Sequence, residues 1–517
     1  MTNHPRVHIA DGILEGSIDA RTGVRAFKGI PFAAPPVGAL RWREPQPVPA
    51  WHGIRPAQQF GARAMQLPIF GDMLFRAPHM SEDCLYLNVW SPVEATNLPV
   101  LVYFYGGGNV AGDGSEPRYD GARLAQQGII CVTVNYRLNV FGFFAHPDLH
   151  HDPDAGAVGN YGYLDQTAAL RWVQHNIAAF GGNPARVTIA GESAGSISVS
   201  AQMVSPRARG LFAGAIGSSG SLLGALPATT LVDAEAVGVA FAKELGVSSV
   251  AEMRALPAHT LLEATQNYQP QHFTGAVDGY FFAQSPWQSF AQGAQASVPL
   301  LVGWNSTEVP YLFLLRDQAP TLANYQAAVH AQFGAQADDI LAHYNANSDA
   351  DVITVATDLA SDLFIGYSTW KWADSHAHVH TVYRYLYAHP RPPLRPELGN
   401  VTEGLAGGII HNEAAPPPPP PLAVGAVHSA DIEYFMGNLD TNDVFAWQED
   451  DQRMSAHMQQ IYLNFVRHGN PNGPGIPDWP ALTAGHVAPV LHLDVDSSIV
   501  NDPHHARYQI LDRLLGQ

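Results

Sequence analysis

Apolar and polar residues occur along this chain in blocks. Six short runs are rich in Val, Ile, Leu and aromatic residues, at 98–105, 128–136, 187–191, 211–219, 298–304 and 380–387. Near-continuous hydrophobicity is typical of strands covered on both faces, whereas a half-exposed strand alternates apolar and polar positions. The pattern therefore predicts six buried strands.

The stretch that begins at Leu164 has a helical period instead. Its apolar stripe comprises Ala169, Val173, Ile177 and Phe180. Gly181, Gly182 and Pro184 are then expected to end the helix before the next strand. Strands that alternate with helices predict an α/β fold, with a mostly parallel central sheet, helices on both faces and helical insertions.

The chain shows no linker between two regions of different composition. We therefore expect one domain over 1–517, with a helical, cap-like insertion around 320–378. The proline run at 416–421 predicts a short polyproline II segment at the surface. In a parallel sheet, ligands bind at the carboxyl ends of the strands, so the chemistry is expected there.

Composition and charge narrow the class of partner. The chain has 517 residues, of which 46% are hydrophobic, and a net charge of −19. Such a charge repels nucleic acids and anionic membranes, so we expect neither as a partner. No secretory leader and no apolar run of about 20 residues is evident, which favours a cytoplasmic protein. Two cysteines are too few for a disulfide framework or a thiolate metal site.

The sequence GESAG at 191–195 contains a Gly-x-Ser-x-Gly motif between a predicted strand and a helical stretch. The motif alone is weak in a glycine-rich chain, and Ser193 is equally compatible with a small residue that fills a turn. A sharp strand-to-helix turn would hold Ser193 in a strained conformation with its hydroxyl exposed as a nucleophile. The Ala194 amide, at the helix N-terminus, would then face a developing oxyanion.

A nucleophile on such a turn requires further parts. The glycine-rich sequence YFYGGGNVAGDG follows the first apolar run, so we predict Gly107 and Gly108 as oxyanion donors. Glu308 follows the run at 298–304 and is a candidate acid, although a surface glutamate fits the spacing equally well. His428 is one of several candidate bases; Ser429 after it is a candidate helix N-cap, with Asp431 in the first turn.

Long motifs resemble one known family. The segments are FKGIPFAAPPVGALRWREPQPVPAW (27–51), SEDCLYLNVW (81–90), NYRLNVFGFF (135–144), GNYGYLDQTAALRWVQHNIAAFGGNP (159–184), GESAGS (191–196) and VHSADIEYFMGN (427–438). In this order they resemble type B carboxylesterases, α/β-hydrolases that include bacterial para-nitrobenzyl esterases, animal carboxylesterases and cholinesterases. The resemblance covers nearly the whole chain.

The resemblance implies a role for each candidate. It implies Ser193 as nucleophile, Glu308 as acid and His428 as base, with an oxyanion hole from the amides of Gly107, Gly108 and Ala194. It places the Glu192 carboxylate beside the nucleophile and the Ser219 hydroxyl near the triad. Arg41 with Glu82, and Arg137 with Asp165, resemble structural ion pairs of the family. It implies no metal and no cofactor.

Three positions depart from the family pattern. The usual disulfide partner of Cys84 falls near Met65, so the loop at 65–84 is not covalently closed. Leu74 replaces the tryptophan with which cholinesterases hold a quaternary ammonium, which makes a choline ester a poor candidate substrate. Asn109 replaces the usual phenylalanine and is expected to put a polar group near the pocket wall.

We therefore expect a serine esterase that hydrolyses carboxylic esters through an acyl-enzyme, as a monomer or homodimer. The expected substrate is a small, neutral, moderately apolar ester, because 67–75 and 280–290 are candidate pocket walls, although both segments also fit a core. The net charge disfavours polyanionic substrates unless local Arg or Lys residues compensate.

Other functions remain as alternatives. An amidase or carbamate hydrolase would use the same triad, and a non-catalytic cholinesterase-like binding protein would keep the fold without activity. Two histidine clusters, at 146–152 and 376–380, are candidates for metal binding, but this role is disfavoured because adjacent loop histidines are usually solvated.

Overall fold

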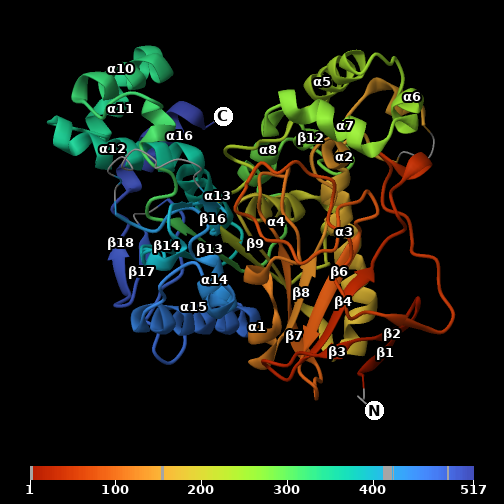
Figure 1. Ribbon diagram of the computed structural model, residues 1–517. Helices are drawn as coiled ribbons and strands as arrows, with labels where there is room; N and C mark the ends of the chain where they lie inside the picture. The colour runs from red at the N-terminus through yellow and green to blue at the C-terminus, as the bar shows by residue number, and fades with distance from the viewer. Residues whose placement is uncertain (1–3, 153–155, 412–421, 423, 486–487, 517) are drawn as a thin grey trace.

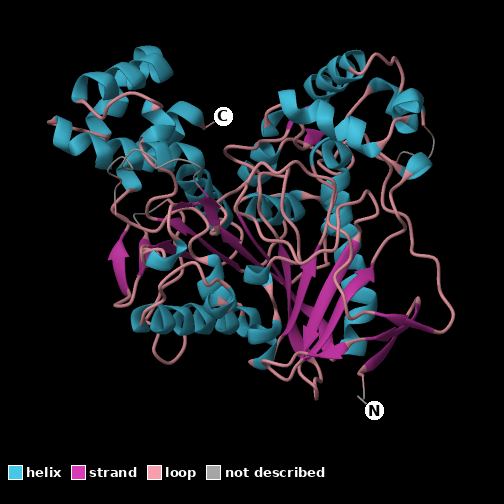
Figure 2. Ribbon diagram, in the orientation of Figure 1, coloured by secondary structure: helices cyan, strands magenta, loops and turns pink. Residues whose placement is uncertain are grey.

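A computed structural model describes residues 4–152, 156–411, 422, 424–485 and 488–516 (Figure 1). The six strands predicted from the apolar runs are all present. They are β7 (Leu98–Phe104), β8 (Ile130–Val134), β9 (Gly182–Glu192), β10 (Gly214–Ser218), β13 (Leu300–Asn305) and β14 (Val382–Tyr387). They pair in parallel in the order β14-β13-β10-β9-β7-β8 and form the centre of one large sheet (Figure 2).

Further strands extend this centre at both edges. In the described part of the chain the sheet has eleven strands, and the added ones are β3 (Ser17–Ile18), β4 (Arg25–Pro31), β6 (Tyr86–Ser91), β17 (Pro489–Leu493) and β18 (Ser498–Asn501). Of these, β17 is parallel to β14, while the others pair antiparallel. The prediction of a mostly parallel sheet is confirmed, and these edge strands are additions to it.

The strand order brings two loops together. Strand β7 lies between β8 and β9, so the chain runs to one side of β7 to form β8 and then crosses to the other side to form β9. At such a switch point, the loops at the carboxyl ends of the strands diverge and leave room for a ligand. Phe104, the last residue of β7, is in register with Gly191 near the end of β9. The glycine-rich turn after β7 therefore lies beside Ser193, and a Cβ added at Gly106 would be 3.1 Å from the Ser193 Cβ.

Helices cover both faces of the sheet. A Cβ added at Gly214 of β10 would point toward Phe465 of α15 (Glu449–His468), whereas one added at Gly217 would meet Trp372 of α13 (Tyr367–Ala377). Since these glycines are three residues apart, their side chains face opposite sides of the strand. Helix α4 (Ala194–Val204) lies on the α13 side, since Ser196 also lies near the Gly217 position.

Helix α3 (Tyr161–Asn176) carries the predicted apolar stripe. Its four residues are all buried, with the last two in the 3₁₀ turn Ile177–Phe180. Gly181 ends this segment at a φ of 90°, a conformation that glycine adopts at little cost. The predicted helix is confirmed, and so is Gly181 as its end, whereas Gly182 and Pro184 already belong to β9.

The segment 320–378 is helical, as predicted. It contains α10 (Leu322–Phe333), α11 (Ala337–His343), α12 (Asp349–Ser361), a π-helical turn (Asp362–Gly366) and α13. Because α13 packs on the sheet, only the earlier helices stand apart from it, as Figure 1 shows. Their action as a cap stays a prediction, and the proline run at 416–421 lies outside the described residues.

Several elements lie outside the predicted pattern. The other helices are α1 (Ala122–Gln126), α2 (Asn139–Phe143), α5 (Leu231–Glu244), α6 (Val250–Ala255), α7 (Ala258–Ala264), α8 (Pro286–Ala291), α9 (Leu312–Leu315), α14 (Ile432–Met436) and α16 (His505–Leu515). The small sheets are formed by β1 (Arg6–Ile9), β2 (Gly12–Glu15) and β5 (Ile54–Pro56), by β11 (Thr229–Thr230) and β12 (Ala276–Val277), and by β15 (Val401–Glu403) and β16 (Ile409–His411).

The ion pairs and thiols agree with the sequence. Arg41 contacts Glu82 at 2.6 Å, and Arg137 contacts Asp165 at 2.8 Å, with all four side chains largely buried. Both pairs carry further hydrogen bonds, as buried charges require. Cys84 is a buried free thiol, so the loop at 65–84 has no disulfide that closes it.

Candidate active site

Ser193 lies on the sharp turn between β9 and α4. Its φ of 55° and ψ of −124° are strained for a residue with a side chain. The turn is tight because glycines flank it: a Cβ added at Gly191 would lie 2.3 Å from the Gly195 carbonyl carbon, and one at Gly195 would lie 2.0 Å from Phe104 O. Only glycine fits at either position, so the small residues of the motif serve the backbone geometry.

The structure brings Ser193, His428 and Glu308 together. His428 Nε2 lies 2.9 Å from Ser193 Oγ, and His428 Nδ1 lies 2.6 Å from Glu308 Oε2. The Glu308 and His428 side chains are almost fully buried. Hydroxyl, imidazole and carboxylate thus form a continuous hydrogen-bonded chain, although the residues come from three distant parts of the sequence.

The Glu308 carboxylate is held by two further donors. Ser219 Oγ donates to Glu308 Oε1 at 2.5 Å, and the Asn305 backbone N–H donates to the same oxygen at 2.7 Å. The Asn305 side chain also donates to Val427 O at 2.7 Å, which ties the loop after β13 to the loop that carries His428. The family resemblance indicated Ser219, whereas Asn305 was missed. Its position at the end of β13, where the chemistry was expected, could have pointed to it.

The helix predicted after His428 begins later than expected. Helix α14 starts at Ile432, and Asp431 is its N-cap residue. Ser429 has a φ of 61°, and its hydroxyl donates to Leu405 O at 2.8 Å. The prediction of Ser429 as N-cap and Asp431 in the first turn is therefore wrong, because the serine hydroxyl bonds a distant carbonyl group.

The three amides predicted as oxyanion donors are available. Gly107 and Gly108 have φ values of 111° and 63° and line the same cavity as Ser193. The Gly107 carbonyl oxygen accepts from Val110 N and Ala111 N. Within the described residues, the N–H groups of Gly107, Gly108 and Ala194 have no hydrogen-bond acceptor. Such unpaired donors beside a nucleophile can stabilise an anionic oxygen.

Glu192 is a buried carboxylic acid next to the nucleophile. Its Oε1 lies 3.4 Å from His428 Nε2. Burial raises the pKa of Glu192 to about 8, although His428 opposes this rise. Burial alone would lower the pKa of His428, but the carboxylates of Glu192 and Glu308 raise it to about 9. The two titrations depend on each other: an ionised Glu192 favours a protonated His428, and a neutral Glu192 favours a neutral one.

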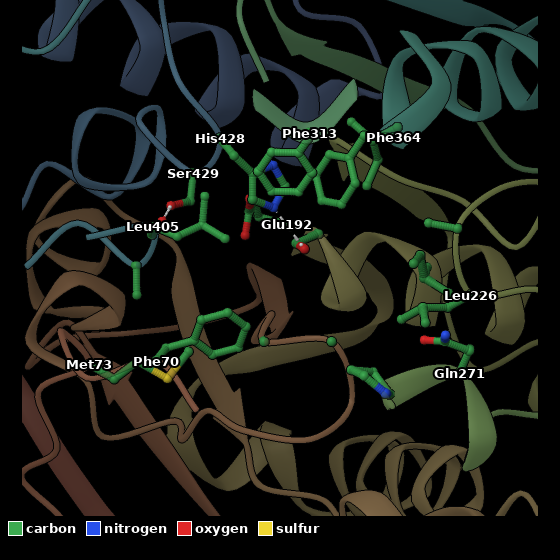
Figure 3. A pocket seen from close by; sticks show the side chains of 18 of the residues that line it. Phe70, Met73, Glu192, Leu226, Gln271, Phe313, Phe364, Leu405, His428 and Ser429 are labelled. Atoms are coloured by element: carbon green, nitrogen blue, oxygen red, sulfur yellow. Dashed lines mark hydrogen bonds and ion pairs between the residues drawn. The ribbon is translucent and has the colours of Figure 1, made fainter. Parts of the chain in front are cut away.

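A cavity of about 350 Å³ opens at Ser193. Its lining is mostly apolar, with Phe70, Met73, Ile197, Ala225, Leu226, Pro270, Phe313, Phe364, Ile365, Leu405 and Ala406. Figure 3 shows Phe313 and Phe364 beside His428, and Phe70 and Met73 across the cavity from them. The Phe364 ring meets the His428 ring edge to face at 5.1 Å. Phe313 lies in the segment after β13 and Phe364 in the segment after α12, and neither was predicted from the sequence to line the pocket.

Of three predictions about the pocket wall, one holds in part and two do not. The segment 67–75 contributes Phe70 and Met73 to the cavity, while Leu74 points elsewhere and is 61% exposed. From the segment 280–290, Phe281 and Phe282 pack on Tyr163 in the core, as the alternative interpretation allowed. Asn109 is buried and does not line the cavity, so the polar group expected near the pocket wall is not there. The backbone turns at Asn109, with a φ of 60°, which directs this side chain away.

Neither histidine cluster belongs to a group of three or more potential metal ligands in the described ranges. His376 instead bonds Gln295 and Val298 O inside the protein. None of the described helices combines the length and apolar character that a bilayer crossing requires.

Comparisons with known proteins show the family of this chain. A model of the carboxylesterase family matches residues 3–511. The chain is 34% identical to the fumonisin B1 esterase of Sphingopyxis macrogoltabida over 93% of this chain and 85% of that protein. It is 33% identical to the para-nitrobenzyl esterase of Bacillus subtilis (strain 168), over 98% of each chain.

Solved structures give the same result. A thermophilic PNB esterase superposes with a TM-score of 0.81 at 30% sequence identity and covers 98% of this chain and 100% of its own. The similarity thus extends over nearly the whole chain. The chain belongs to the carboxylesterase family, has the α/β-hydrolase fold, and is a carboxylic ester hydrolase.

Proposed function

We propose that this protein is a serine esterase that hydrolyses small carboxylic esters through an acyl-enzyme on Ser193. The observation that carries the proposal is the hydrogen-bonded chain from Ser193 through His428 to Glu308 at the wall of an apolar cavity. A serine hydroxyl is a weak nucleophile, and an adjacent imidazole oriented by a carboxylate is the arrangement that activates it.

In the first half of the reaction, His428 Nε2 takes the proton as Ser193 Oγ attacks the ester carbonyl carbon. Glu308 accepts a hydrogen bond from Nδ1–H and so fixes the tautomer that leaves Nε2 free as a base. The resulting imidazolium then gives its proton to the departing alcohol. In the second half, water attacks the acyl-enzyme by the same route and releases the acid.

The negative charge on the carbonyl oxygen is assigned to the amides of Gly107, Gly108 and Ala194. Their unpaired N–H groups support this assignment, since no backbone rearrangement is needed before they donate. Ser219 acts through Glu308, whose carboxylate it positions. The largely apolar lining favours an ester with an apolar acyl or alcohol group.

The pH dependence follows from the base. His428 accepts a proton only when neutral, so kcat/KM for a neutral ester is expected to rise with pH as the Glu192 and His428 pair loses protons. Glu192→Gln removes the negative charge that raises the pKa of His428, so the acidic limb of the profile should move to lower pH. The measurement is kcat/KM from about pH 5 to about pH 10 for both proteins. An unchanged limb, or one moved to higher pH, contradicts this assignment.

The acyl-enzyme is tested by covalent labelling. A fluorophosphonate ester should react once per chain, with loss of fluoride and formation of a Ser193 Oγ–P bond, and should abolish turnover of para-nitrophenyl butyrate. Peptide mass spectrometry should place the adduct on the peptide that contains Ser193. His428→Ala should react far more slowly, because no base then activates the hydroxyl. Labelling at another residue, or inhibition without an adduct, contradicts the proposal.

A further inference from the structure

The wall of the catalytic cavity carries a cationic side chain that the proposed mechanism does not use. Arg118 belongs to the 3₁₀ turn Pro117–Tyr119 between β7 and α1. Among the described residues that line the cavity, it is the sole lysine or arginine. Its side chain is only 8% exposed, which is unusual for arginine unless the charge is paired or used.

Three contacts hold the Arg118 guanidinium in place. Nε donates to Glu116 Oε2 at 3.0 Å, and Nη1 donates to Ala406 O at 2.6 Å. The guanidinium carbon lies 4.8 Å from the centre of the Tyr119 ring. In the described part of the chain, Nη2 has no hydrogen-bond acceptor. Protein atoms do not fully enclose it either. The arginine therefore keeps a free donor on a pre-oriented group.

The acidic side chains near Arg118 are themselves buried. Burial raises the pKa of Glu116 to about 7, although Arg118 opposes this rise. Burial also raises the pKa of Glu192 to about 8, although His428 opposes this rise. The nearby Glu433 is paired with Arg391 at 3.1 Å. Arg118 is thus the one permanently cationic group among the described residues of this cavity wall, in a protein of strongly negative net charge.

We propose that Arg118 binds a carboxylate carried by the substrate, so that the preferred ester combines an apolar body with one anionic group. This inference rests on the proposed function, since it names the substrate class of the same site. The free Nη2 donor supplies a charged hydrogen bond, and the apolar remainder of the lining accommodates the rest of the ester. A single cationic group suits one carboxylate better than a polyanion, and the neutral ester expected from the sequence becomes the alternative.

The test compares matched charged and neutral esters. Mono-para-nitrophenyl glutarate against para-nitrophenyl valerate probes a carboxylate on the acyl part. A second pair, 4-acetoxybenzoate against 4-methylphenyl acetate, probes one on the alcohol part. For each pair the ratio of kcat/KM, charged over neutral, is measured in the wild type and in variants, so that intrinsic differences in leaving group cancel.

The variants separate charge from structure. Arg118→Gln alone would leave Glu116 as a buried carboxylate without its partner, so Glu116→Gln/Arg118→Gln replaces both. Arg118→Lys keeps the charge without the planar group. Arg123→Met is the matched control, because Arg123 pairs with Asp440 outside the cavity. Thermal unfolding of each variant checks its fold.

For at least one probe pair, the ratio should fall by about tenfold or more in the double variant, mainly through KM, as expected for loss of a charged hydrogen bond. Arg118→Lys should retain part of the preference, and Arg123→Met all of it. A ratio that is the same in the wild type and the double variant for both pairs overturns the inference, as does an equal loss on all four esters. If none of the four esters is hydrolysed, or if they persist as substrates of Ser193→Ala, the proposed function fails instead.

Discussion

Ser193→Ala is expected to lower kcat for para-nitrophenyl butyrate by a factor of about 10⁴ or more, because the atom that forms the acyl-enzyme is removed. Residual hydrolysis would come from binding and from the oxyanion donors, which the substitution leaves in place. The measurement is release of para-nitrophenol at saturating ester by equal concentrations of folded wild type and variant.

A matched control uses another serine of helix α4. Ser200 is fully buried and its hydroxyl donates to Ile197 O at 2.7 Å, yet it does not line the cavity. Ser200→Ala should therefore keep most of the turnover. Equal turnover by the wild type and Ser193→Ala would exclude the nucleophile assignment, whatever the control shows.

The three proposed catalytic residues should also act as one unit. His428→Ala is expected to lose about as much kcat as Ser193→Ala, and Ser193→Ala/His428→Ala should lose little more than either, because a base without its nucleophile contributes nothing. If the losses in the double variant multiplied, the two residues would act independently, and the 2.9 Å contact between them would have no catalytic meaning.

The centre of the sheet was predictable because its strands are buried on both faces. Every residue of β8 is apolar or β-branched and buried, so hydrophobicity alone marks it. Strand β6 was missed because Asn88 interrupts its apolar run. In the structure Asn88 bonds Thr133 and Gly29 across two neighbouring strands, a compensation that only the folded sheet supplies.

The candidate site was predictable to the extent that its chemistry is local. The turn at Ser193 follows from the flanking glycines, but spacing alone left Glu308 and His428 open among many acids and histidines. These two meet Ser193 only through strand order, and it was the family resemblance that pointed to them. The cavity walls Phe313 and Phe364 were missed, since helix packing rather than any local pattern brings them to His428. The hydrogen bond from Ser429 to Leu405 O, which replaces the expected N-cap, also depends on tertiary packing and was missed for the same reason.

The second large effect is expected from the turn itself. Gly195→Ala should lower the free energy of unfolding by about 3 kcal/mol or more, because the new Cβ would meet a backbone atom that has no room to move. Phe104 O would lie 2.0 Å from that Cβ, at the end of β7, which pairs with β9 in the middle of the sheet. Surviving folded protein should also have lost turnover, since any shift of the turn displaces both Ser193 and the Ala194 amide. The measurement is the urea unfolding midpoint together with kcat.

Gly71→Ala is the matched control for this effect. A Cβ at Gly71 would meet no atom within 4 Å, so its unfolding free energy should change by no more than about 0.5 kcal/mol. If Gly195→Ala instead unfolded like the wild type, the turn would have to be looser than its contacts indicate. The strained conformation of Ser193 would then lack the constraint that maintains it, because strain of this kind persists only where the surrounding structure over-determines the backbone. A loss of both stability and turnover would show that the close contact of β7 with the turn also holds the nucleophile in position.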